Sequence, residues 1–171
     1  VSKSFNSITI DGDCSTNDTI AILANGAAGN PRIAKSGAAY NAFRDALLLI
    51  AEKLAKSIVV DGEGATRFVE VSVSGGANSK DAVTVARSIA YSPLVKCAVN
   101  GGDPNWGRII CAAGYSGANV DPEKMRLWIN GTLLFKGGMP VKVSKDKLAE
   151  CMKPKEIMIR LDLGQGKAAA R

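Results

Sequence analysis

Histidine is absent from this sequence of 171 residues. Its absence excludes a Ser-His-Asp triad and a Cys-His pair from the chain, because both use an imidazole as the general base. It also removes the commonest metal ligand in proteins. Acid–base chemistry therefore has to come from carboxylates, lysines, backbone groups or an N-terminal amine.

Cysteine is scarce and dispersed. The four cysteines, Cys14, Cys97, Cys111 and Cys151, are far apart and form no C-x-x-C pair. This spacing is unlike a zinc site or the disulfide framework of a small secreted domain. We therefore predict no metal site, and reduced thiols in a cytosolic or matrix compartment.

Long apolar runs and targeting signals are also missing. No stretch approaches the roughly 20 apolar residues that cross a bilayer, so we expect no membrane partner. Residues 1–4 have neither the basic-then-apolar shape of a secretory signal nor the Arg-rich composition of a transit peptide. The first residue is Val1 rather than Met, which leads us to expect a processed chain or a piece of one.

Aromatic residues make up only 5% of the sequence, which argues against a nucleic-acid-binding role for its positive charge. The net charge is +6, and residues 121–171 carry 11 Lys and Arg against 6 Asp and Glu. A basic surplus can mark a nucleic-acid surface. Single-strand binding platforms, however, combine basic side chains with aromatic ones, whereas these lysines are interleaved with acids. A solvated surface is the better interpretation, and we predict no nucleic-acid partner.

The first half of the chain predicts a mixture of strands and helices. Residues 4–10 and 19–24 have the composition of short strands, and the second segment also fits the start of a helix. Apolar residues at three- and four-residue steps predict a long helix over residues 36–57, whose stripe we expect to be buried against a sheet. Alternation predicts a strand over residues 68–73. Asn78 or Ser79 is positioned to cap a helix that runs to Tyr91.

The second half continues this mixture. Residues 94–99 form a short apolar segment, and residues 106–113 are predicted to be a helix. Asn130-Gly131 lies between two apolar runs, which is the strongest hairpin signal in the chain. A capped helix is expected over residues 144–152 and a strand over residues 156–163. We therefore predict one domain over residues 1–171, of the α/β (α+β-like) class, with layered sheets covered by helices.

Two polar segments could bind ions but lack the residues that this requires. Residues 11–15 begin like a calcium loop, but Thr16 replaces the turn glycine and Ile22 replaces the bidentate acid, so we predict a turn instead. The glycine-rich residues 101–108 precede a helix and could present N–H groups to an anion. They match neither a P-loop nor a dinucleotide fingerprint, and we expect Trp106 to pack in the core.

The segment Asp61-Gly62-Glu63-Gly64-Ala65-Thr66 places a carboxylate between two glycines. An ordinary helix-to-strand loop is one interpretation, since loops collect Gly and Asp for turn formation. The other is a functional turn, because glycine permits tight backbone conformations and a close approach by a ligand. The surrounding motifs favour the second interpretation.

Several short motifs occur in a fixed order along the chain. They are Phe5-Asn6, residues 11–19, residues 24–26, residues 61–66, residues 94–96, residues 102–108, and Asp162-Leu163-Gly164 with Gly166. Together they closely resemble the ornithine acetyltransferase family, also called glutamate N-acetyltransferases or bifunctional arginine-biosynthesis proteins. The resemblance extends over nearly the whole chain.

The resemblance implies a self-cleaving, N-terminal-threonine acetyltransferase fold. A precursor cuts itself, and the threonine freed at the start of the β chain becomes the nucleophile. This sequence resembles an incomplete β chain that lacks the nucleophile segment and the C-terminal segment. No catalytic residue is therefore assigned, and Thr16, Thr19 and Thr66 are not candidates. Among the substrate-binding positions of the family, only Glu63 falls within the chain.

The implied reaction is acetyl transfer from N-acetylornithine to glutamate through an acetyl-threonine, with acetyl-CoA as a possible further substrate and no cofactor. The implied partner is an α chain from the same precursor, in a heterotetramer of two α and two β chains. The expected location is the mitochondrial matrix in a eukaryote or the cytoplasm in a bacterium. We expect the chain alone to be inactive. Two alternatives stay open: a related aminopeptidase-like hydrolase with an N-terminal nucleophile, and a non-enzymatic anion-binding module.

Overall fold

The structure of the chain is a computed structural model that describes residues 1–13 and 16–171. Contacts divide the chain into two compact units, which we call unit 1 (Val1–Val59) and unit 2 (Val60–Arg171). Each unit is described by itself. The prediction of one domain over residues 1–171 stays a prediction for the intact protein. Among the described residues, no helix has the length and apolar character needed to cross a membrane.

Unit 1 contains one long helix and little other regular structure among its described residues. The short 3-10 helix η1 (Phe5–Ser7) occupies the first predicted strand, and residues 19–24 form neither strand nor helix. Both strand predictions are therefore wrong for this chain. A strand needs a hydrogen-bonded neighbour, and the apolar side chains of the second segment are exposed, with Leu23 at 91%.

Helix α1 (Ala38–Val60) confirms the long helix predicted from the apolar periodicity. The stripe residues of this helix are exposed, from 38% at Leu47 to 62% at Phe43. The described part of unit 1 contains no strand, so the sheet that this stripe was predicted to cover is not in this unit.

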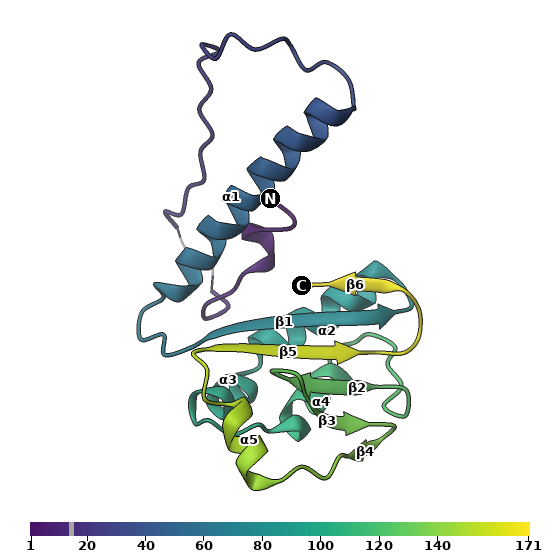
Figure 1. Ribbon diagram of the computed structural model, residues 1–171. Helices are drawn as coiled ribbons and strands as arrows, with labels where there is room; N and C mark the ends of the chain where they lie inside the picture. The colour runs from purple at the N-terminus through teal and green to yellow at the C-terminus, as the bar shows by residue number, and fades with distance from the viewer. Residues whose placement is uncertain (14–15) are drawn as a thin grey trace. The chain divides into compact units, whose positions relative to one another are not determined.

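Unit 2 is built on one six-stranded sheet in the order β4-β3-β2-β5-β1-β6 (Figure 1). The central strands β1 (Phe68–Gly76) and β5 (Glu156–Asp162) are parallel, and Phe68 is paired with Glu156. All other pairs are antiparallel, and they involve β2 (Arg126–Ile129), β3 (Thr132–Lys136), β4 (Met139–Pro140) and β6 (Ala168–Ala170). A parallel pair requires a long crossover, and here the crossover contains most of unit 2.

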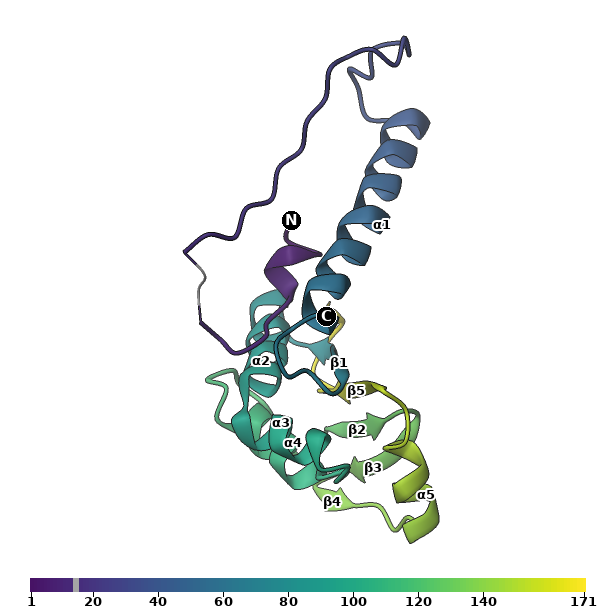
Figure 2. The ribbon, with the colours of Figure 1, turned by 90° about the vertical axis from the view of Figure 1, so that its left-hand side faces the viewer.

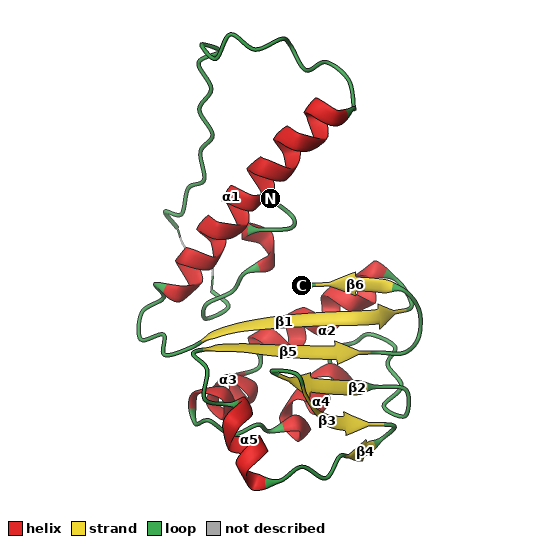
Figure 3. Ribbon diagram, viewed as in Figure 1, coloured by secondary structure: helices red, strands yellow, loops and turns green. Residues whose placement is uncertain are grey.

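Three helices of that crossover, α2 (Ser79–Tyr91), α3 (Pro93–Asn100) and α4 (Trp106–Gly114), lie together on one side of the sheet (Figure 2). The short helix α5 (Lys145–Cys151) follows β4. In Figure 3, which colours helices red and strands yellow, α2 and α4 lie behind the strands of the sheet. The predicted layered α/β (α+β-like) arrangement, with helices covering a sheet, is confirmed.

Local signals explain where these helices begin. The Asn78 side chain accepts a hydrogen bond from Asp81 N, and the Ser92 side chain accepts one from Val95 N. Pro93 occupies the first turn of α3, where its missing N–H has no partner to lose. The predicted cap at Asn78 and the predicted end at Tyr91 are thus both confirmed.

The core of unit 2 lies between the sheet and the helices α2, α3 and α4. Alternate residues of β5 are buried, as the strict alternation predicted, and they belong to the same core cluster as the buried face of α2. The buried residues of these two elements are Ile157, Ile159, Leu161, Ala82, Val85, Ala86 and Ile89. Trp106 stacks on Phe135 with ring centroids 5.5 Å apart, which confirms that it packs against the core.

The Asn130-Gly131 turn joins β2 to β3 as predicted. Asn130 has a φ of +44° and Gly131 a φ of +78°, the sign that a two-residue type I′ turn requires at both positions. The Asn130 side chain also donates to Cys151 O at 2.8 Å and accepts from Met158 N at 2.8 Å. This one side chain therefore connects the hairpin, the end of α5 and strand β5.

A second tight region forms where the chain leaves β5 and passes β1. Gly75 has a φ of +69°, and a Cβ at this position would lie 2.2 Å from Asp162 Oδ1 and 2.7 Å from Gly164 N. Backbone hydrogen bonds hold the two segments together, from Leu163 N to Ser74 O and from Gln165 N to Gly75 O, both 2.8 Å. Only glycine fits this close approach without a shift of the backbone.

Candidate functional site

Glu63 lies at the corner of a tight turn between α1 and β1. Ala65 N donates to Gly62 O at 2.9 Å, so residues 62–65 form a β-turn with Glu63 and Gly64 at its centre. Gly64 has a φ of +70°, which the third position of a type II turn requires and which glycine adopts at no steric cost. The sequence therefore forms this turn because a glycine follows the glutamate.

The Glu63 carboxylate is exposed and available to a ligand. Among the residues that the structure describes, it makes no hydrogen bond and no ion pair. An arginine or lysine paired with Glu63 would have argued for a purely structural role. No such pair exists within the described chain, so the arrangement is compatible with binding a cationic group.

The residues after the turn fasten it to three different elements. The Thr66 hydroxyl donates to Asn100 Oδ1 at 2.6 Å, at the end of α3. The Arg67 guanidinium donates to the carbonyls of Met152 and Pro154, just after α5. Phe68 N donates to Lys155 O at 3.0 Å, just before β5. The exposed turn is thus held firmly on its C-terminal side.

The structure also brings the two glycine-rich segments of the sequence together. Asn100 directly precedes Gly101-Gly102, and a Cβ at Gly102 would lie 3.7 Å from Arg67 Nη2. The turn at residues 61–66 and the loop at residues 101–108 are therefore neighbours, joined by the Thr66–Asn100 hydrogen bond. Sequence reasoning treated them as separate motifs and missed Asn100 and Arg67.

The loop at residues 101–108 is organised by its own side chains. Asn105 caps α4, with its Oδ1 accepting from Arg108 N at 3.1 Å, and its Nδ2 donates to Asp103 Oδ2 at 3.0 Å. Arg108 Nη1 donates to Leu94 O at 2.9 Å. A carboxylate and a capping amide already occupy the start of this helix, which disfavours an anion there.

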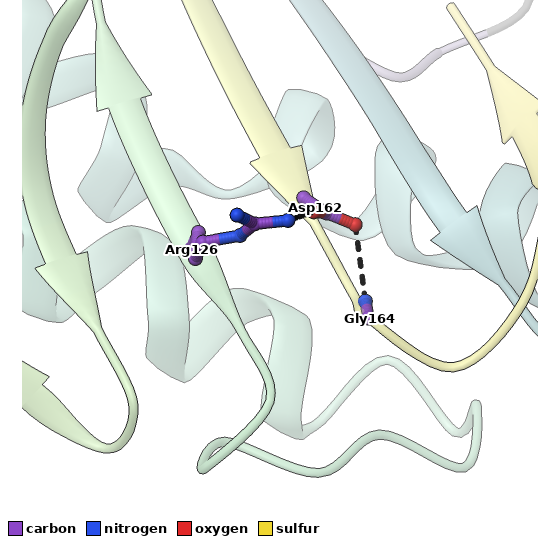
Figure 4. Close-up of polar contacts among 3 residues, drawn as sticks. All are labelled: Arg126, Asp162 and Gly164. Carbon is purple, nitrogen blue, oxygen red and sulfur yellow. Dashed lines mark hydrogen bonds and ion pairs between the residues drawn. The ribbon is translucent and has the colours of Figure 1, made fainter.

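The Asp162-Leu163-Gly164 motif also has a structural role (Figure 4). Asp162 Oδ2 lies 2.5 Å from Arg126 Nη2 on the neighbouring strand, and Asp162 Oδ1 accepts from Gly164 N at 3.1 Å. The ion pair joins β5 to β2, and the second hydrogen bond shapes the turn after β5. This motif stabilises the sheet, and Glu63 remains the candidate for substrate binding.

Among the described residues, no group of three or more Cys, Asp or Glu side chains could hold a metal ion. In unit 1, Asp13 N donates to Asp11 Oδ1 at 2.9 Å, which is the side-chain-stabilised turn predicted for this segment. Two residues of the predicted turn, Cys14 and Ser15, lie outside the described residues.

The described cysteines are free thiols that differ in exposure. Cys97 and Cys111 are exposed, whereas Cys151 is buried and its Sγ contacts Leu148 O. Burial raises the pKa of the Cys151 thiol, so less of the reactive thiolate forms at a given pH.

We expect Cys151 to resist alkylation by iodoacetamide at pH 8 in the folded chain and to react in denaturant. Cys97 provides the internal control, because its exposed thiol should be modified under both conditions. Peptide mapping by mass spectrometry measures each site separately. Equal labelling of Cys151 and Cys97 in the folded protein would contradict the burial of Cys151.

Known proteins of one family match nearly the full length of this chain. The model of the ArgJ family matches residues 1–171. The "Arginine biosynthesis bifunctional protein ArgJ" of Symbiobacterium thermophilum is 48% identical over 98% of this chain and 42% of its own length. The mitochondrial ArgJ of Schizosaccharomyces pombe is 49% identical over 97% of this chain and 39% of its own length. The chain thus spans about two fifths of these relatives.

A solved structure supports the fold. The crystal structure of the arginine biosynthesis bifunctional protein ArgJ from Bacillus halodurans matches with a TM-score of 0.94 and 40% identity. The match covers 99% of this chain and 80% of the crystal chain. The fold implied by the sequence resemblance is therefore confirmed.

Proposed function

Because this chain belongs to the ArgJ family, we propose that the intact protein transfers acetyl groups from N-acetylornithine to glutamate in arginine biosynthesis. The observation that carries the proposal is the family match over residues 1–171. The curated relatives are named as bifunctional proteins of arginine biosynthesis. The chain contributes part of the enzyme, including Glu63, and the acetylated nucleophile is supplied by a segment outside it.

The reaction has two steps. A threonine hydroxyl attacks the acetyl carbonyl of N-acetylornithine, the C–N bond breaks, and the amine leaves as ornithine after taking up a proton. The amine of glutamate then attacks the acetyl-threonine ester, which forms N-acetylglutamate and restores the hydroxyl. An N-terminal threonine suits this chemistry because its own amine can act as the base. The absence of histidine from the chain is consistent with such a mechanism.

Glu63 is proposed to bind the ammonium group of the substrate. N-acetylornithine and ornithine carry an ammonium group, and glutamate carries one when it enters as the acceptor. A carboxylate forms a strong, charge-assisted hydrogen bond with such a group. The exposure of Glu63 and its lack of a partner among the described residues support this role. The carboxylate does not have to break an ion pair with a lysine or arginine of the described chain before it binds the substrate ammonium.

We further propose that the chain functions together with an α chain from the same precursor, in a heterotetramer of two α and two β chains. The chain covers 80% of the related crystal chain but 42% of a curated relative. The crystal chain is therefore about half as long as the curated protein, which is the length expected of one product of a cleaved precursor. Acetyl-CoA is proposed as a second acetyl donor. The proposed compartment is the mitochondrial matrix in a eukaryotic source, in keeping with a relative that is named mitochondrial, and the cytoplasm in a bacterial one.

The Glu63→Gln variant of the complete enzyme tests this proposal. Glutamine keeps the size of the side chain and removes its charge, so the charge-assisted contact of about 1.5–3 kcal/mol is lost. We expect kcat/KM for N-acetylornithine to fall by about 10- to 150-fold. Steady-state kinetics with both substrates measures the effect.

Two controls accompany this measurement. Glu123→Gln changes an exposed glutamate in the turn before β2 and should leave the kinetics unchanged. The 171-residue chain alone should transfer no acetyl group, because the nucleophile lies outside it. Unchanged kinetics of Glu63→Gln with both substrates would rule out the role of Glu63, and transfer by the isolated chain would contradict the need for the missing segments.

A further inference from the structure

We infer that Thr66 and Asn100 are positioning residues, whose hydrogen bond fixes the turn that presents Glu63 to the substrate. The inference rests on the proposed function of Glu63 and assigns a role to two residues that do not themselves bind substrate. It also explains why a threonine follows the Gly-Glu-Gly turn. Thr66 is not a nucleophile, and its hydroxyl is already engaged as a donor to Asn100 Oδ1.

Asn100 provides a rigid anchor for this contact. It is the last residue of α3, and the preceding residues Val95, Ala98 and Val99 of that helix are buried. Backbone hydrogen bonds close the helix end around it, from Gly101 N to Cys97 O at 3.0 Å and from Asp103 N to Ala98 O at 2.9 Å. The acceptor of the Thr66 hydroxyl is therefore attached to the core of unit 2.

Thr66 is the first attachment after the turn. Towards the N-terminus, the hydrogen bond between Ala65 N and Gly62 O closes residues 62–65 on themselves. Towards the C-terminus, Arg67 and Phe68 are fixed to residues near α5 and β5. Without the Thr66 hydrogen bond, the first attachment after the turn would be Arg67, one residue further along the chain. The turn that carries Glu63 would then be less restrained. The side chain of threonine is restricted about χ1, so its hydrogen bond to Asn100 limits how far the backbone at Thr66 can move relative to α3.

The exposure of this pair allows a positioning role to be distinguished from a contribution to the stability of the fold. Thr66 and Asn100 are both exposed, so their hydrogen bond adds little to the core. A carboxylate that binds substrate, in contrast, must be held close to its productive geometry. Removing the bond should therefore weaken substrate binding while the folded structure persists.

The test uses the complete enzyme with Thr66→Val, which keeps the shape of the side chain and removes its hydroxyl. We expect the KM for N-acetylornithine to rise by about 3- to 10-fold, with kcat within about twofold of the unaltered enzyme. Asn100→Ala should have the same effect. Thr66→Ser and Asn100→Asp should restore nearly normal kinetics, because each keeps the donor or the acceptor. Thr84→Val, which makes the same substitution at a half-buried position of α2 away from the turn, is the control.

A combined variant separates this inference from the function of Glu63. With Glu63→Gln already in place, Thr66→Val should raise KM no further, because the group that it positions has lost its charge. If Glu63→Gln is impaired and Thr66→Val is normal, the positioning role is wrong and the role of Glu63 stands. If Thr66→Val has its full effect in the Glu63→Gln enzyme, the contact is only structural and the inference fails. Normal kinetics of Glu63→Gln would overturn both.

Discussion

Replacing Gly75 by alanine is expected to lower the free energy of unfolding of unit 2 by about 2–5 kcal/mol. Gly75 has a φ of +69°, a conformation that costs alanine about 1–2 kcal/mol. The new methyl group would also lie 2.2 Å from Asp162 Oδ1 and 2.7 Å from Gly164 N. Since one of these neighbours is backbone, relief requires the chain after β5 to move away from β1.

The measurement is urea denaturation followed by tryptophan fluorescence. The two tryptophans of the sequence, Trp106 and Trp128, both lie in unit 2, so the signal reports this unit. Gly117→Ala is the control, because Gly117 has a φ of +86° and nothing within 4 Å of its Cβ position. It should show the conformational cost alone. Equal destabilisation by both variants would mean that the contacts with Asp162 and Gly164 contribute nothing.

Asn130→Ala is the second substitution with a large expected effect, a loss of about 2–4 kcal/mol in the free energy of unfolding. Alanine would give up the hydrogen bonds to Cys151 O and Met158 N, both 2.8 Å. It would also have to adopt the φ of +44° that asparagine tolerates better. The turn would lose its side-chain contacts with both the end of α5 and strand β5.

Two further variants at this position divide the effect. Asn130→Gly keeps the backbone conformation and loses the side-chain contacts, so we expect it to be about 1 kcal/mol less damaging than Asn130→Ala. Asn130→Asp keeps an acceptor for Met158 N but has no donor for Cys151 O. The same fluorescence-detected denaturation applies. A glycine variant as stable as the unaltered chain would show that the side-chain hydrogen bonds are not needed.

The fold of unit 2 was largely predictable because its elements carry local signals. The alternation of residues 156–163, the caps at Asn78 and Ser144, and the Asn130-Gly131 turn each act over a few residues, and each appears in the structure. The order of the strands was not predictable in this way. The pairing of β1 with β5 joins residues far apart in the sequence, and no local pattern specifies it.

In unit 1, by contrast, the strands predicted from local composition do not form. The segment at residues 19–24 has strand-forming side chains, but Ile20, Ile22 and Leu23 are exposed and form no ladder. Composition gives a segment a preference for the extended state, and only a neighbouring strand stabilises it.

The candidate site was predictable in part. Glu63 was identified because glycines flank it and because the surrounding motifs resemble a known family. Asn100 and Arg67 were missed, since neither belongs to a residue pattern that indicates a contact with the turn. The only available signal was the position of Asn100 at the end of an apolar segment, directly before two glycines. Its partner Thr66 becomes evident only when the chain is folded.

The parallel pairing of β1 with β5 also bears on how this protein is made. On the ribosome, the β2–β3 hairpin has both of its strands as soon as Lys136 emerges. Strand β1 has to wait for Glu156–Asp162 before its central neighbour exists. Until then this side of β1 has no hydrogen-bonded neighbour, and unpaired strand edges promote aggregation of nascent chains. Translation that pauses before Glu156 should therefore yield a product that depends on chaperones.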